Sequence, residues 1–135
     1  MIRHLQQPKD SHLCGQTCVA MITGVSIEKS IEVFGTRGGT RTKQVVAALR
    51  KFGIATVTPR LVRWNGQQRP PDYAILHMIW KSVSGRKTPW KHWLLCWAGV
   101  LYDPSLPEPR PLVIPSDIDS HLMGGIITSY LEIKH

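Results

Sequence analysis

The sequence is poor in acidic residues. Only 9 Asp and Glu stand against 17 Lys and Arg, which gives the 135-residue chain a formal net charge of +8. Such an imbalance suits an acidic partner or nucleic acid. The basic residues are scattered, however, and no nucleic-acid recognition motif occurs. We therefore favour a generally basic surface over a dedicated nucleic-acid interface, which stays the less favoured interpretation.

Cysteine is also scarce. The chain has three cysteines, an odd number, so it is not a disulfide scaffold. Cys14 and Cys18 are four residues apart and Cys96 stands alone. No second cysteine pair or suitably spaced histidine completes the four ligands of a structural zinc site. We expect no metal and no other cofactor.

Long apolar stretches are missing as well. The longest runs, such as Trp93–Val100, are far shorter than the roughly 20 residues that cross a bilayer. The N-terminal stretch Met1–Gln7 lacks the apolar core of a signal peptide. We therefore expect no membrane association and a cytoplasmic location.

What remains is the composition of a folded globule, with 42% hydrophobic residues. A chain of this size forms one domain and can bury roughly two-thirds of its unfolded surface. No internal repeat or linker divides it. We predict a single domain over residues 1–135.

Helix signals fill the first half of the chain. Gly24, Gly35 and Gly53 each follow a segment with apolar residues at helical spacing, which is typical of helix ends. Ser26 is a favourable N-cap, and Thr40 or Thr42 is expected to cap the third helix. The predicted helices span Cys14–Thr23, Ile27–Phe34 and a segment that ends at about Phe52.

Strand signals fill the second half. Five prolines between Pro104 and Pro115 exclude regular structure there. Helices followed by an antiparallel sheet predict the α+β class, with a helical subdomain packed on the sheet. The expected strands are Ile54–Thr58, Tyr73–Trp80, His92–Trp97, Val100–Asp103 and Ile126–Ile133.

A cysteine stands at the expected start of the first helix. Cys14 follows the polar stretch Pro8–His12 and precedes the apolar-periodic residues. A cysteine attacks as the thiolate, and the unpaired N–H groups and positive dipole end of a helix stabilise that anion. Cys14 is therefore the candidate nucleophile, although a free cysteine is often only a small buried apolar residue. Cys18, one turn further on, is expected to pack in the core.

A histidine and an aspartate flank the predicted hairpin. His92 begins one strand and Asp103 ends the next. If Ala98 and Gly99 form a two-residue turn, Asp103 lies on the same sheet face as His92 and within diagonal reach. A three-residue turn would place it on the opposite face. A carboxylate in reach would orient the imidazole and stabilise the imidazolium.

Acyl transfer also needs donors for the oxyanion. The backbone N–H of Cys14 is one candidate, and the side chain of Gln7 is the second, with Gln6 as the alternative.

Four residues are candidates for substrate binding. Gly15 would let a substrate backbone come close to the nucleophile. The substrate is expected to enter beside Trp90, which precedes the His92 strand, and beside the loop that holds Gly38 and Gly39.

With these residues the sequence resembles the papain-like cysteine peptidase superfamily, and most closely the bacterial group that includes the double-glycine leader peptidases. The resemblance rests on Gln7, on the string Cys14-Gly15-x-x-Cys18, on His92-Trp93 and on Tyr102-Asp103-Pro104. It implies a helical subdomain that carries the Cys and an antiparallel sheet that carries the His and Asp of a catalytic triad. Without a transporter portion, export-coupled leader cleavage is not expected.

The sequence thus favours a cysteine peptidase or related thiol hydrolase acting on a peptide or protein substrate. Two alternatives stay open. One is a catalytically inactive papain-like module that binds an acidic protein or nucleic acid through its basic surface. The other is an acyltransferase, because the acceptor is not encoded in the triad. No sequence feature indicates an oligomeric state.

Overall fold

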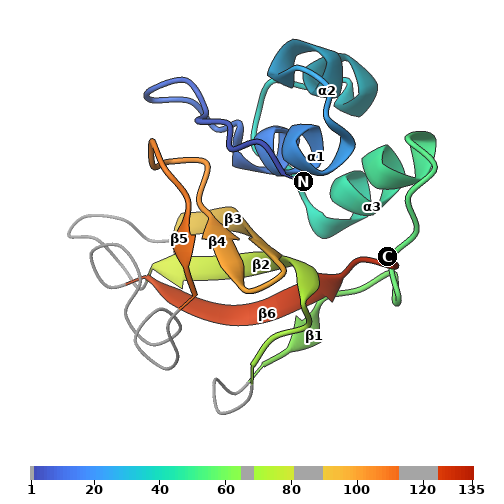
Figure 1. Ribbon diagram of the computed structural model, residues 1–135. Helices are drawn as coiled ribbons and strands as arrows, with labels where there is room; N and C mark the ends of the chain where they lie inside the picture. Colours follow the sequence, from blue (N-terminus) through green and yellow to red (C-terminus); the bar gives the residue numbers. More distant parts are fainter. Residues whose placement is uncertain (1, 65–68, 81–89, 113–124) are drawn as a thin grey trace.

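Three helices lie on one face of a six-stranded antiparallel sheet (Figure 1). The computed structural model describes residues 2–64, 69–80, 90–112 and 125–135, and these elements are counted within those ranges. The α+β class predicted from the order of the segments is confirmed. No helix in the same ranges is long and apolar enough to cross a membrane.

The first two helices have the predicted bounds. Helix α1 spans Cys14–Thr23 and ends at Gly24, which has a φ of 77°. Helix α2 spans Ile27–Phe34. The side chain of Ser26 accepts a hydrogen bond from the backbone N–H of Lys29 at 3.0 Å, so Ser26 is the predicted N-cap.

The third helix, α3, spans Thr42–Lys51 and begins differently from the prediction. Neither Thr40 nor Thr42 caps it. The N-cap is Arg41, whose backbone N–H donates to Oε1 of Gln44 at 2.8 Å. A glutamine in the first turn thus supplies the side-chain contact that the prediction had assigned to a threonine.

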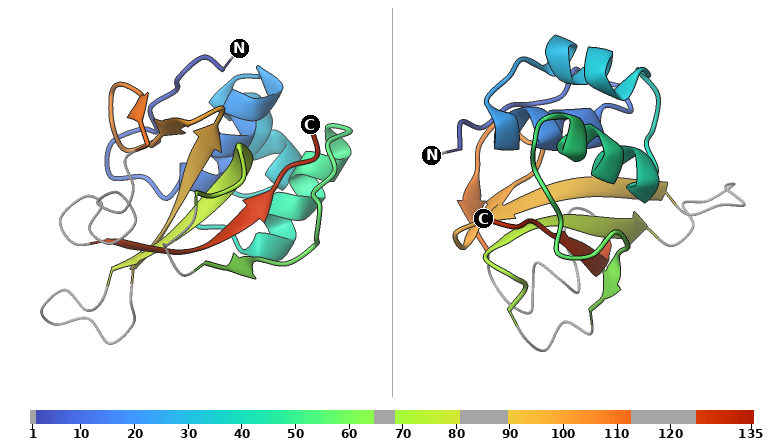
Figure 2. Two further views of the ribbon diagram at one scale, coloured as in Figure 1. Left: turned by 60° about the horizontal axis from the view of Figure 1, so that its bottom comes forward. Right: turned by 90° about the vertical axis from the view of Figure 1, so that its right-hand side faces the viewer.

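The sheet has the order β1-β6-β2-β3-β4-β5. The final strand therefore lies between the first two, as Figure 2 shows in both views. The sheet is complete only when the C-terminal segment has joined it. The strands are β1 (Val62–Arg63), β2 (Tyr73–Trp80), β3 (Trp90–Trp97), β4 (Val100–Tyr102), β5 (Arg110–Pro111) and β6 (Ile126–Glu132).

Two short strands depart from the prediction. The expected strand Ile54–Thr58 is reduced to a single bridge between Thr56 and Ile133, and the pairing with β6 comes later, at β1. β5 lies inside the proline-rich segment. Pro111 is tolerated there because β5 is an edge strand, where a missing N–H costs no ladder hydrogen bond.

The hairpin between β3 and β4 has the turn on which the site depends. Trp97 pairs with Val100, so Ala98 and Gly99 form a two-residue turn with φ values of 51° and 80°. Positive φ at both positions is typical of a type I′ turn, whose twist matches that of the strands. The predicted register is confirmed, because Leu95 faces Tyr102.

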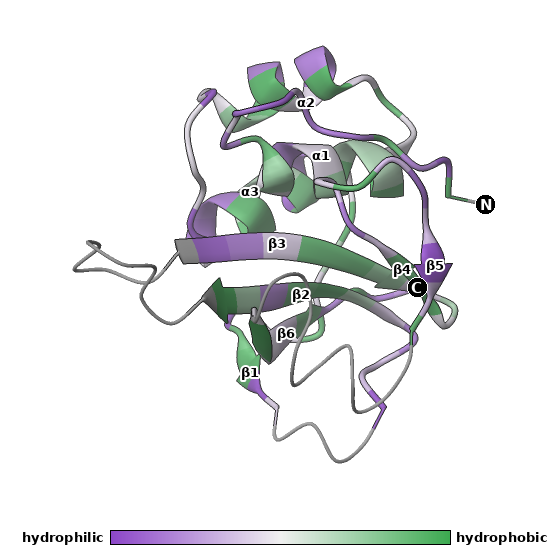
Figure 3. Ribbon diagram, turned by 90° about the vertical axis from the view of Figure 1, so that its left-hand side faces the viewer, coloured by the Kyte–Doolittle hydropathy of each residue, from purple (hydrophilic) through white to green (hydrophobic). Residues whose placement is uncertain are grey.

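The sheet is buried on both faces. Successive side chains of a strand point to opposite faces, and Figure 3 shows β3 changing from a polar start to an apolar remainder beneath the helices. One cluster between helices and sheet contains Cys18, Val19, Val45, Leu49, Ile75, Leu95 and Leu131. A second cluster contains Ala74, Leu76, Met78, Leu94, Cys96, Leu101 and Ile127.

Candidate active site

Cys14 is the first residue of α1, as the sequence predicted. The first hydrogen bond of this helix runs from the backbone N–H of Thr17 to the carbonyl oxygen of Leu13, at 2.9 Å. Helix N–H groups before that point have no intrahelical partner, and Leu13 provides no side-chain cap. The positive end of the helix dipole is therefore directed at Cys14, whose exposed fraction is 9%.

His92 and Asp103 form a buried pair. Nε2 of His92 donates to Oδ1 of Asp103 at 2.8 Å, and the two side chains are 8% and 1% exposed. The predicted contact is confirmed. β4 pairs only with residues 95–97 of β3, so His92 lies beyond the end of that pairing, where the chain after β4 brings Asp103 to it.

Ser105 holds the same carboxylate oxygen. Its backbone N–H and its hydroxyl donate to Oδ1 of Asp103 at 2.9 and 2.7 Å. Sequence reasoning missed this residue. The signal was present, because an aspartate often accepts hydrogen bonds from the backbone two residues further on in a turn. Three donors on one oxygen favour the ionised carboxylate.

The His92 ring is held in its charged form. Burial disfavours the charge, but hydrogen bonds with Asp103 and Cys14, together with the charges of both groups, raise the pKa of His92 from 6.5 to about 9. Because Nε2 is engaged with Asp103, Nδ1 is the ring nitrogen left to exchange a proton with the Cys14 thiol. The three groups thus form a connected chain from carboxylate through imidazole to sulfur.

Gln7, the predicted oxyanion donor, is tied to the loop that carries Asp103. Its backbone N–H donates to the carbonyl oxygen of Pro104 at 2.7 Å. Its side-chain Nε2 donates to the carbonyl oxygen of Ser11 at 3.0 Å and to Oγ of Ser11 at 3.4 Å. The alternative, Gln6, is exposed and its Nε2 lies 3.5 Å from the carbonyl oxygen of Ser105.

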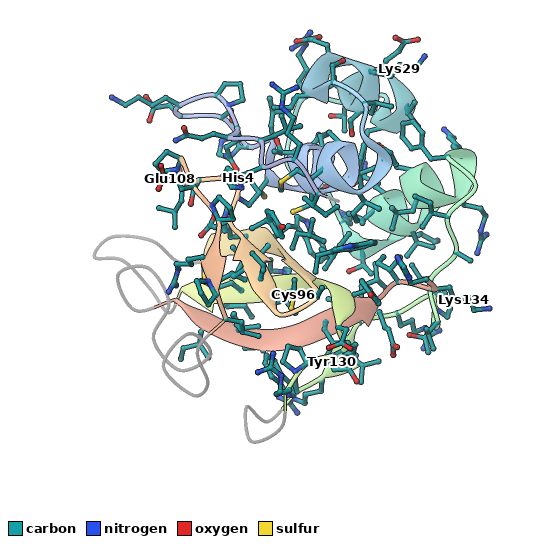
Figure 4. The ribbon with its side chains drawn as sticks, viewed as in Figure 1. His4, Lys29, Cys96, Glu108, Tyr130 and Lys134 are labelled. Atoms are coloured by element: carbon teal, nitrogen blue, oxygen red, sulfur yellow. The ribbon has the colours of Figure 1, made fainter. Side chains whose placement is uncertain are left out.

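His4 adds a further link between the N-terminal segment and this loop. Its Nε2 donates to the carbonyl oxygen of Leu106 at 2.7 Å, and its ring stacks on that of Tyr102 at 6.1 Å. Figure 4 places His4 beside the loop that carries Glu108. The segment before α1 therefore braces the turn that positions Asp103.

The glycine loop is brought to the start of α1. Nε2 of Gln16, a fully buried residue, donates to the carbonyl oxygens of Thr36 and Gly38 at 3.0 and 2.9 Å. Gly38 and Gly39 are exposed and stand next to the helix turn that carries Cys14. Sequence reasoning missed Gln16, because nothing in the sequence pairs it with a loop 20 residues away.

Gly15 has a packing role. A Cβ there would collide with Oγ1 of Thr40 and would lie 3.1 Å from Cδ1 of Trp93. Trp93 is 3% exposed, and its Nε1 donates to the carbonyl oxygen of Thr40 at 3.2 Å. Close approach of this loop accounts for the glycine, and its predicted contact with a substrate stays a prediction. The side chain of Trp90, also predicted to bind substrate, lies outside the described residues.

The other two cysteines are unsuited to attack. Burial, together with the charges of Cys14 and Asp103, raises the pKa of Cys18 well above its usual value. Burial raises the pKa of Cys96 to about 11, despite a backbone hydrogen bond from Gly99 that lowers it. Both thiols lie within the core clusters, and no group of three metal-ligating side chains occurs in the described ranges.

No family model matches the sequence, and no curated protein is significantly similar to it. The chemistry of this site is therefore inferred from the arrangement of its own residues. That arrangement is a cysteine at a helix start, an imidazole that hydrogen-bonds to it, and a buried carboxylate behind the imidazole.

Proposed function

We propose that this protein is a cysteine peptidase or related thiol hydrolase of the papain-like kind. The observation that carries the proposal is the chain of contacts from Asp103 to His92 to Cys14. It consists of a 2.8 Å hydrogen bond and an imidazole whose pKa is raised to about 9 by both neighbours. A raised imidazole pKa favours a thiolate–imidazolium pair at neutral pH.

The first half of the proposed reaction forms a thioester. The Cys14 thiolate attacks the carbonyl carbon of a peptide bond, and the carbonyl oxygen becomes an oxyanion. The imidazolium of His92 then gives its proton to the leaving amine as the C–N bond breaks. The products are an acyl group on the sulfur of Cys14, a free amine and a neutral imidazole.

The second half restores the enzyme. Neutral His92 takes a proton from water, the resulting hydroxide attacks the thioester carbonyl, and the C–S bond breaks to release a carboxylic acid and the thiolate. Asp103 holds the ring throughout and stabilises its charged form. The backbone N–H of Cys14 and the side-chain amide of Gln7 are the proposed donors to the oxyanion, and the amide would exchange a Ser11 contact for the oxyanion.

The order of the elements supports the papain-like assignment. The nucleophile begins the first of three helices. The histidine lies on β3 of an antiparallel sheet, and the aspartate directly follows the neighbouring strand β4. This is the arrangement that the sequence resemblance implies. Substrate is proposed to lie along the exposed Gly38-Gly39 loop, which Gln16 holds at the start of α1.

A cleavage screen tests the proposal. The protein is incubated at neutral pH with a complex mixture of peptides, and new termini are identified by mass spectrometry. Cys14→Ala should abolish cleavage. The matched control is Cys18→Ala, which removes a neighbouring thiol of the same helix and should leave cleavage in place. Cleavage that survives in Cys14→Ala would refute the assignment.

The same screen separates hydrolysis from acyl transfer. Adding a small primary amine would convert the acid products into amides if the thioester reacts with amines in preference to water. An absence of both kinds of product, together with retained binding of a partner by Cys14→Ala, would favour the inactive binding module.

A further inference from the structure

An open groove lies away from the candidate active site. It has a volume of about 610 Å³ and runs between α3 and the segment around Arg60 that precedes β1. Figure 2 shows this segment descending beside α3 toward the sheet. None of the residues that line it belongs to the proposed triad.

The groove has an apolar floor and cationic walls. The apolar lining residues are Val46, Ala47, Pro59 and Leu61, whereas Lys43 and Arg50 stand on the helix side and Arg60 on the other. Residues three, four and seven apart share one face of a helix. Lys43, Ala47 and Arg50 are exposed and form such a face on α3.

Among the residues that the structure describes, no acidic side chain lines this groove. In the sequence, eight Lys and Arg but no Asp or Glu lie between Glu32 and Asp72. Lys43, Arg50 and Arg60 form no ion pair with another residue that the structure describes.

We propose that this groove binds an extended peptide segment of a partner protein in which acidic side chains alternate with apolar ones. Successive side chains of an extended chain point in opposite directions. Apolar side chains can therefore enter the floor at Val46 and Leu61 while carboxylates reach Lys43, Arg50 and Arg60. The apolar contacts supply affinity, and the cations select against basic or neutral segments.

The floor argues for a peptide rather than nucleic acid. Single-stranded nucleic acid is held by aromatic side chains on which bases stack. The described residues that line this groove include no aromatic side chain and offer aliphatic ones instead. The inference does not depend on the proposed hydrolase activity, because the groove shares no residue with the triad.

Fluorescence anisotropy with the full chain tests the proposal. The probe is a short fluorescein-labelled peptide that alternates glutamate with leucine, compared with the same peptide in which glutamine replaces glutamate. We expect the acidic peptide to bind, the glutamine peptide to bind much more weakly, and added salt to weaken the acidic complex. Cys14→Ala should bind the acidic peptide like the native chain.

Two sets of variants locate the binding. The double variant Lys43→Glu and Arg50→Glu should weaken binding by about tenfold or more, because it places repulsive charges on the wall of the groove. The matched control, Arg3→Glu with Lys9→Glu, makes the same change in net charge at exposed positions outside the groove. It should leave affinity within about twofold of the native value.

A second variant keeps the charge constant. Ala47→Phe fills the floor from an exposed helix position and should weaken binding while the far-UV circular dichroism stays native. Equal losses in the two charge variants, unchanged binding in Ala47→Phe, or no binding by the native chain would each overturn the proposal. Preferential binding of a single-stranded oligonucleotide of equal charge would do the same.

Discussion

Ser105 donates twice to one oxygen of Asp103. Its hydroxyl and its backbone N–H reach Oδ1 at 2.7 and 2.9 Å, and the same oxygen accepts from Nε2 of His92 at 2.8 Å. The carboxylate therefore cannot rotate without breaking several hydrogen bonds at once. In the proposed mechanism, Ser105 is a positioning residue that acts on His92 through Asp103.

Removing the hydroxyl of Ser105 should impair catalysis with little effect on substrate binding. We expect Ser105→Ala to lower kcat about tenfold with KM nearly unchanged, because loss of a hydrogen bond to a buried charged group costs about 1–3 kcal/mol. Steady-state kinetics on a cleaved peptide would measure the split. Ser105→Thr keeps the hydroxyl and should restore most of the rate. Equal rates in native protein and Ser105→Ala would contradict the positioning role.

Alkylation should distinguish the three cysteines. Cys14 hydrogen-bonds to the His92 ring, whereas burial holds the pKa of Cys18 well above its usual value and that of Cys96 at about 11. At pH 7, iodoacetamide should modify Cys14 first, as peptide mass spectrometry of the native protein would record. His92→Ala should slow that modification by about tenfold or more. Similar rates at all three thiols would contradict the assignment of the nucleophile.

Stability should depend on pH through His92. The native ring keeps its proton up to a pH of about 9, because its pKa is raised from 6.5 by Asp103 and Cys14. The unfolded chain releases that proton near pH 6.5. In Cys14→Ala, which has no thiolate to offset the imidazolium, Asp103 still holds the proton above that pH, so the native state binds more protons than the unfolded state. The free energy of unfolding should therefore fall as pH rises across this window, by up to about 1.4 kcal/mol per pH unit from this group.

Denaturant unfolding of Cys14→Ala, and of Cys14→Ala combined with His92→Gln, at several pH values would measure this contribution, because both proteins lack the thiolate. Glutamine keeps a hydrogen-bond donor but does not titrate, so the double variant should show a shallower fall in stability above pH 6.5. Parallel curves for the two proteins would show that His92 does not hold the extra proton.

A methyl group at Gly15 should destabilise the fold. Its Cβ would collide with Oγ1 of Thr40 and crowd the Trp93 ring. Overpacking of this kind costs about 1–3 kcal/mol, which denaturant unfolding of Gly15→Ala would measure. Gly39→Ala is the matched control, because nothing lies within 4 Å of a Cβ at that position. Adding Thr40→Ala to Gly15→Ala should recover part of the loss, and no recovery would place the strain elsewhere.

Local chemistry in the sequence determined most of the elements. Gly24 and Gly35 end their helices with φ values of 77°, a conformation that glycine adopts without steric cost. The turn at Ala98 and Gly99 fixed the hairpin register. That register sets where β4 ends, and the turn that follows, in which Ser105 holds Asp103, brings the carboxylate to His92. These features depend on residues that are close together in the chain, so they can be predicted from the sequence alone.

Tertiary structure decided the contacts between distant segments. The side chain of Gln16 reaches the loop at Gly38, and Gly15 is small because Thr40 packs against it. The third helix is another case, since the contact at its start comes from Gln44 rather than from a threonine. Several side chains could make each such contact, and local propensity does not choose among them.

The sheet order also became visible only in three dimensions. β6 lies between β1 and β2. The expected strand at 54–58 therefore makes only one bridge, beyond the end of β6, and the strand that pairs with β6 is β1. Which strands are neighbours depends on how apolar faces on both sides of the sheet are buried together. The sequence by itself predicted Cys14, His92 and Asp103 as the candidate triad, and it determined the local turn between the strands that precede and follow it. The packing of α1 on the sheet brings Cys14 to His92. Apolar side chains of the helix and of distant strands are buried together in one core cluster, and local sequence does not specify that arrangement.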